Sequence, residues 1–124
     1  MLPQDLEDWL TDAGDAVVRK PEANRSEQEQ LVHEIWLFDT EARNGGVSQY
    51  FGNWGLDQWQ ICLSVTSRGH VPSFAPFARQ ISRMIAGADD PYEALIELGS
   101  APDDAWDKAK VAVVSELKAS CHAL

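Results

Sequence analysis

The chain has 124 residues, with 20 acidic residues against 10 lysines and arginines, a formal net charge of −10 at pH 7. This length suits one domain with its own core, and five tryptophans, four phenylalanines and two tyrosines are available to fill it. The charge argues against direct binding of nucleic acid, because phosphates would be repelled, and no 18-residue apolar run suggests a membrane span.

The acidic residues are concentrated towards the two ends of the sequence. Residues 1–41 hold 11 acids and 3 bases, residues 42–88 hold 1 acid and 4 bases, and residues 89–124 hold 8 acids and 3 bases. The three segments therefore carry net charges of −8, +3 and −5. Such a surface can attract a basic protein electrostatically and guide its binding. The same distribution of acids is also expected if the acidity only keeps the protein soluble.

Neither the N-terminus nor the cysteines suggest secretion, redox chemistry or metal binding. The acidic start lacks the basic and apolar regions of a secretory signal. Cys62 and Cys121 are far apart, and no histidine or cysteine has a companion at metal-ligand spacing. We expect a cytoplasmic protein with reduced thiols and with no metal and no cofactor.

Helical spacing of apolar residues predicts an all-α fold, a compact helical bundle of six or seven helices in which residues 1–124 form a single domain. The first helix is expected over residues 3–19, ahead of Pro21. Ser26 and Glu29 form a capping-box pattern that opens the second helix, and the glycines at 45 and 46 end it.

The second half of the chain continues the helical pattern between glycine stops. We expect a short helix over 47–53, a break at Gly55, and further helices over 56–67 and 73–86. Asp90 and Pro91 open a short helix that runs to residue 98, and a final helix covers 103–119.

A dense group of polar, glycine and aromatic residues lies between the second and third predicted helices. The glycines allow a sharp reversal, the polar side chains can hydrogen-bond across it, and one or both aromatic residues should enter the core. We predict that the group builds and locks a corner of the fold. It consists of Glu41, Asn44, Gly45, Gly46, Gln49, Tyr50, Phe51 and Asn53.

This Glu-x-x-Asn-Gly-Gly-x-x-Gln-Tyr-Phe-x-Asn pattern resembles the signature of a bacterial domain-of-unknown-function family whose best-known member is a Neisserial DNA mimic. The resemblance implies a small, acidic, helical fold, and it leaves a homodimer open. It also implies that surface acids replace DNA phosphates and so occupy the nucleic-acid-binding surface of a basic partner. The signature itself concerns the fold, so the acids must be identified separately.

Two rows of acids are candidates for partner binding. Asp5, Asp8, Asp12 and Asp15 are three, four and three residues apart, which places them on one face of the first helix. Glu27, Glu34 and Glu41 are seven apart and form a second line on the next helix, of which Glu27 and Glu34 are assigned to the binding surface. Like charges at these spacings repel one another, so helix stability alone does not favour them.

The leading hypothesis is an acidic inhibitor, a DNA mimic that binds a basic nucleic-acid-binding protein such as a transcription factor, a nuclease or a CRISPR effector. One alternative is an immunity protein that neutralises a basic toxin through the same electrostatics. Another is a small enzyme with a polar site at Glu41, Asn44 and Gln49. No direct contact with nucleic acid or membrane is expected, and no catalytic residue is assigned.

Overall fold

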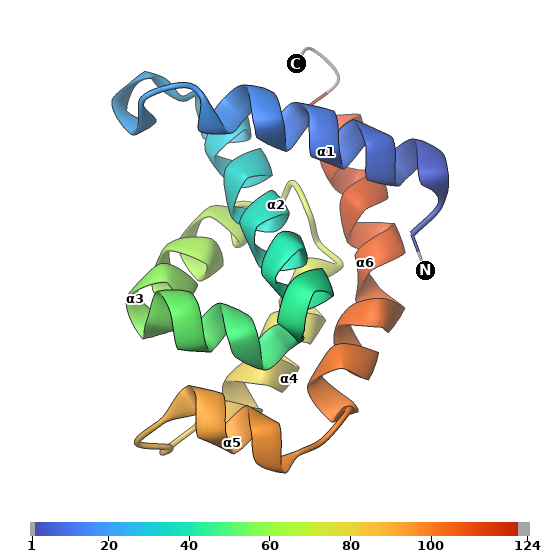
Figure 1. The fold of residues 1–124 in the computed structure, drawn as a ribbon. Helices are drawn as coiled ribbons and strands as arrows, with labels where there is room; N and C mark the ends of the chain where they lie inside the picture. The colour runs from blue at the N-terminus through green and yellow to red at the C-terminus, as the bar shows by residue number, and fades with distance from the viewer. Residues whose placement is uncertain (1, 122–124) are drawn as a thin grey trace.

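The computed structural model describes residues 2–121, and within that range the chain forms six α-helices, one 3-10 helix and no strand (Figure 1). The all-α prediction is confirmed. The helices are α1 (Gln4–Val18), α2 (Glu27–Gly45), α3 (Val47–Thr66), α4 (Phe74–Ile85), α5 (Pro91–Glu97) and α6 (Ala101–Ser120), with the 3-10 turn η1 (Glu22–Asn24) between α1 and α2.

Local signals set most of the helix ends. The capping box is present, since Ser26 Oγ accepts from the Glu29 N–H at 3.1 Å and Glu29 Oε1 accepts from the Ser26 N–H at 3.0 Å. The Asp90 side chain accepts hydrogen bonds from the first backbone N–H groups of α5. α6 begins two residues earlier than predicted, because Pro102 fits within the first turn.

Two glycines with positive φ shape the middle of the chain. Gly46, at φ 91° and ψ 167°, separates α2 from α3. Gly55, at φ 77°, kinks α3 where the sequence predicts a break between two helices. The kink turns the first part of α3 away from the second, so that α3 folds around one side of α2 (Figure 1).

α2 is the central helix of the bundle, since it packs against α1, α3 and α6. α1 crosses one end of the bundle and α5 lies at the other end, next to α3 and α4 (Figure 1). Gly14 allows the crossing of α1 over α2, because a Cβ there would collide with the Trp36 ring.

An aromatic cluster around Phe38 forms the core. The Phe38 ring lies 4.8–6.3 Å, between centroids, from five other rings supplied by α3, α4 and α6. These separations are typical of favourable aromatic pairs. The five rings belong to Tyr50, Trp59, Phe74, Phe77 and Trp106.

A buried carboxylate ties α6 and α1 to this core. Asp39 accepts a 3.0 Å hydrogen bond from Trp106 Nε1 and also pairs with Arg43 Nε at 3.0 Å. Arg43 extends the network to α1 through a 2.9 Å ion pair with Glu7. The Asp39 carboxylate is therefore buried with both of its oxygens engaged.

Candidate partner-binding surface

The acidic row of α1 lies on the outside of the bundle. Asp5, Asp8, Asp12 and Asp15 are all exposed, whereas the buried side of the same helix consists of Leu10, Gly14 and Val17. The helical spacing read from the sequence therefore places the four carboxylates at the surface together.

Few cations compensate these four carboxylates. Asp15 pairs with Arg19 at 3.0 Å between two largely exposed side chains, and Asp8 accepts from Gln4 Nε2 at 2.8 Å. Within residues 2–121, Asp5 and Asp12 have no ion pair and no side-chain hydrogen bond. The last turn of α1 also contains no basic residue. Acids near a helix C-terminus oppose the helix dipole, although the pair with Arg19 four residues later supports Asp15 there.

The second predicted row does not form an acidic surface. Glu27 is exposed, but Glu34 is only 1 % exposed and Glu41 is half-buried. The assignment of Glu34 to partner binding is therefore wrong. Its side of α2 is covered by α3, and Gln58 of α3 donates a 2.6 Å hydrogen bond to Glu34 Oε1.

The other oxygen of Glu34 is engaged as well. Gln30 Nε2 donates to Oε2 at 2.9 Å, and His33 Nδ1 lies 2.9 Å from the same atom. Glu34 thus has the hydrogen bonds that a buried carboxylate requires. Glu27 lies at the beginning of α2, where Arg68 and His70 approach it at 3.6 and 3.5 Å.

α5 and the two residues before it carry a further group of exposed acids that the sequence analysis did not single out. Asp89, Asp90, Glu93 and Glu97 are all exposed, at the end of the bundle away from α1. Glu93 and Glu97 are four residues apart on one helix, which is the signal that could have identified them.

The corner predicted from the signature residues is present, and Gly46 has the positive φ expected there. Tyr50 and Phe51 are both buried. Asn53 Nδ2 donates to Glu41 Oε2 at 2.6 Å across the corner. Asp103 of α6 supplies an interaction that the sequence analysis missed, because its Oδ1 accepts from the Val47 N–H at 2.7 Å.

The hydrogen bonding expected around Asn44 and Gln49 is not formed. Asn44 is exposed, and neither residue makes a side-chain hydrogen bond within the described part of the chain. Asn44 points to solvent beside the corner, so the three polar residues of the hypothetical enzyme site do not share one pocket.

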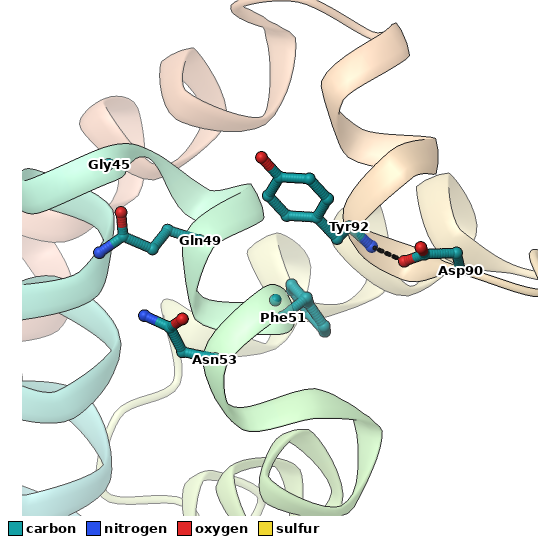
Figure 2. A pocket seen from close by; sticks show the side chains of 7 residues that line it. Gly45, Gln49, Phe51, Asn53, Asp90 and Tyr92 are labelled. Atoms are coloured by element: carbon teal, nitrogen blue, oxygen red, sulfur yellow. Dashed lines mark hydrogen bonds between the residues drawn. The ribbon is translucent and has the colours of Figure 1, made fainter.

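An open pocket of about 500 Å³ lies between the start of α3 and the start of α5 (Figure 2). Gln49 and Asn53 line it from α3, and Tyr92 and Asp90 line it from the opposite side. Glu41 and Asn44 do not line it. The remaining lining residues are Gly45, Phe51 and Gly52.

The two cysteines are buried thiols. Burial raises the pKa of Cys121 to about 11, and burial, with a smaller contribution from the Glu34 charge, raises the pKa of Cys62 well above its ordinary value. Both are therefore protonated at neutral pH, whereas a nucleophilic cysteine requires the thiolate. The prediction that Cys62 belongs to the core is confirmed.

No helix among residues 2–121 is long and apolar enough to cross a membrane. In the same range, no group of three or more His, Cys, Asp or Glu residues is arranged to hold a metal ion.

Comparison with known proteins identifies the family. The family model described as DMP19-like protein matches residues 23–119, and the chain belongs to this DNA-mimic family. The match includes the whole corner, α2 to α5 and α6 up to residue 119, but it excludes the whole of α1 with its acidic row. No curated protein and no solved structure gives a significant match.

Proposed function

We propose, from the family membership and the exposed acids of α1, that this protein is a cytoplasmic DNA mimic. It binds a basic nucleic-acid-binding protein and occupies the surface that would otherwise contact DNA or RNA. Candidate partners are a transcription factor, a nuclease or a CRISPR effector.

The exposed row of Asp5, Asp8, Asp12 and Asp15 is the observation that carries the proposal. With a rise of 1.5 Å per residue, successive carboxylates are separated by about 4.5 to 6 Å along the helix axis. These intervals are on the order of the charge spacing along a DNA strand. A basic groove that binds phosphates can therefore bind this row through the same lysine and arginine side chains.

The distribution of charge over the rest of the protein supports this interpretation. Most basic residues of the N-terminal segment have acidic neighbours, since Arg19 pairs with Asp15 and Lys20 pairs with Glu29 at 2.6 Å. The four aspartates nevertheless remain exposed together. Their mutual repulsion costs a few tenths of a kcal/mol per pair, roughly, which an intermolecular contact with a cationic surface would offset.

The partner can be identified by affinity capture. The protein is immobilised and exposed to native lysate at low salt, and the proteins released by a high-salt wash are identified by mass spectrometry. A mimic that binds through opposed charges should release a basic nucleic-acid-binding protein at moderate salt. Capture that persists at high salt, or that recovers only acidic proteins, would contradict the proposal.

A charge-matched pair of variants tests whether the α1 row is the binding face. Asp8→Lys with Asp12→Lys reverses two acids four residues apart on α1, and Asp57→Lys with Glu97→Lys reverses two exposed acids outside that row. Both variants have the same net charge. The α1 variant should lose the partner while the control variant retains most of its affinity; equal losses would indicate a dependence on net charge alone.

A further inference from the structure

We propose that the pocket between α3 and α5 binds the guanidinium group of an arginine side chain presented by a protein partner. The inference deepens the proposed function, on which it rests for the existence of a basic partner. It assigns a specific recognition site to a region that the α1 row does not include.

Two glycines create the space for the pocket walls. A Cβ on Gly45 would collide with the carboxamide of Gln49, and a Cβ on Gly52 would lie 2.9 Å from Cδ1 of Tyr92. The Gln49 amide and the Tyr92 ring can therefore lie directly against the backbone of α2 and α3. Figure 2 shows Gln49 with its amide turned towards Gly45 on one side of the pocket and the Tyr92 ring on the other side.

The pocket is rich in hydrogen-bond acceptors. The Nδ2 of Asn53 donates to Glu41, so the Oδ1 of the same amide is left as an acceptor. Asp90 Oδ1 accepts from the N–H groups of Tyr92 and Glu93 at 3.0 and 3.4 Å, which leaves its Oδ2 available. Within residues 2–121, Gln49 makes no side-chain hydrogen bond, so its carbonyl oxygen is also available.

The charge at the pocket favours a cation. Asp90 lies on its wall, and Glu41 lies behind Asn53 at 2.6 Å. None of the described lining residues is a lysine or an arginine. The Gln49 amide and the Tyr92 hydroxyl also offer donors, but an anion would find no positive charge among the described lining residues, whereas a cation would find carboxylate and amide oxygens together.

The arrangement suits arginine better than lysine. A guanidinium is planar and carries five N–H donors, so it can bond several acceptors at once while its face stacks on an aromatic ring. Tyr92 is 38 % exposed and supplies such a ring, Asp90 lies on the same side of the pocket, and Gln49 and Asn53 line the opposite side (Figure 2). The compact ammonium of lysine could satisfy fewer of these groups from one position.

A direct test titrates the ¹⁵N-labelled full-length protein with acetyl-arginine amide and follows the amide signals by NMR. The comparison ligands are the Nα-acetyl amides of citrulline and of lysine. Citrulline is nearly isosteric with arginine but neutral, and lysine keeps its charged side-chain ammonium. We expect saturable shifts at Gly52 and at the side-chain amides of Gln49 and Asn53. Arginine should bind about tenfold or more tightly than citrulline, because only arginine is charged.

Variants of the pocket sharpen this test. Tyr92→Ala should weaken arginine binding by about threefold or more, whereas Tyr92→Phe should retain it, because the ring face makes the contact. Asp90→Asn keeps a side-chain cap for α5 but removes the charge, and it should also weaken binding. Ile96→Ala, on the same helix and outside the pocket, should have no effect.

Two outcomes would overturn the proposal. One is equal binding of arginine and citrulline amides, and the other is a set of shifts that spreads over the acids of α1 and α5 without saturating at the pocket. The Asp8→Lys, Asp12→Lys variant should still bind arginine amide in the pocket. Its result therefore separates a failure of this inference from a failure of the α1 binding face.

Discussion

The carboxylate of Asp103 accepts a 2.7 Å hydrogen bond from the backbone N–H of Val47, although the two residues are 56 positions apart. Val47 is the first residue of α3, and the preceding Gly46 has no side chain with which to cap that helix. Asp103, from the first turn of α6, therefore caps the N-terminus of α3 in place of an N-cap side chain. The contact joins the signature corner to the C-terminal helix.

Replacing Asp103 by alanine should destabilise the protein by about 1 kcal/mol, which is the typical effect of losing an N-cap acceptor. Urea unfolding followed by circular dichroism measures the change. Asp104→Ala is the control. Asp104 is the next residue, and within the described residues its exposed carboxylate accepts a hydrogen bond only from Ser100. Equal effects of the two substitutions would show that the bond to Val47 has no special role.

Gly46 should not tolerate a side chain. Its φ of 91° and ψ of 167° lie in a region that essentially only glycine adopts, and a Cβ would lie 3.1 Å from Asp103 Oδ2. Gly46→Ala should lower the free energy of unfolding by about 1 kcal/mol or more.

Gly87→Ala provides a comparison for Gly46→Ala, since Gly87 also has a positive φ, of 73°, but has open space around it. Gly46→Ala should cost more than Gly87→Ala in thermal or urea unfolding. A Gly46→Ala protein as stable as the wild type would contradict this description of the corner.

Glu34 should contribute to stability and not to binding. Glu34→Ala removes the acceptor for Gln30 and Gln58 and leaves donors without partners, which should cost about 1–3 kcal/mol. Glu27→Ala, at an exposed position on the same helix, should change stability by less than about 0.5 kcal/mol. Comparable unfolding free energies for the two variants would contradict the buried assignment of Glu34.

The stability should depend on the protonation of Glu29. Its hydrogen bond from Lys20, followed by those of the capping box, lowers the pKa of Glu29 below its ordinary value of 4.5. A lowered folded-state pKa gives stability that is present above the unfolded-state value, and this stability is lost as the pH falls through the folded-state pKa. The loss therefore begins near pH 4.5 and continues below it.

Glu29→Gln should remove the stability that the ionised Glu29 carboxylate contributes. The difference in unfolding free energy between wild type and variant should therefore shrink as the pH falls from 7 towards the acid range. Glu22→Gln is the control, because Glu22 is exposed and has no side-chain partner within the described residues. A wild type and a Glu29→Gln variant that lose stability in parallel would contradict the assignment.

The sequence predicted the helices well because their ends depend on neighbouring residues. The Ser26 capping box, the glycine at 46, the kink at Gly55 and the Asp90–Pro91 start are all local signals that act within one turn. The exposed row of α1 was accessible for the same reason, since helical spacing alone groups its aspartates.

The contacts between distant segments could not be predicted in this way. Helical spacing placed Glu34 in a row with the exposed Glu27, but α1, α3 and α6 surround α2, and Glu34 is buried. The cap from Asp103 and the placement of Tyr92 over Gly52 each join parts of the chain more than 30 residues apart. No local pattern contains that information.

Charge reversal on α1 should leave the fold intact. Asp8→Lys with Asp12→Lys relieves like-charge repulsion at helical spacing, so the melting temperature should stay unchanged or rise slightly. A marked fall in the melting temperature would show that these acids support the fold, which would remove the reason for assigning them to a partner.

A titration against the captured partner, with and without competing duplex DNA, tests the central claim most directly. Wild-type protein should bind with an affinity that falls steeply as salt rises, and DNA should displace it in a concentration-dependent way. The Asp8→Lys, Asp12→Lys variant should bind at least about tenfold more weakly, because two attractive contacts become repulsive. Equal affinities of the two proteins, or the absence of competition by DNA at any concentration, would contradict mimicry through the α1 face.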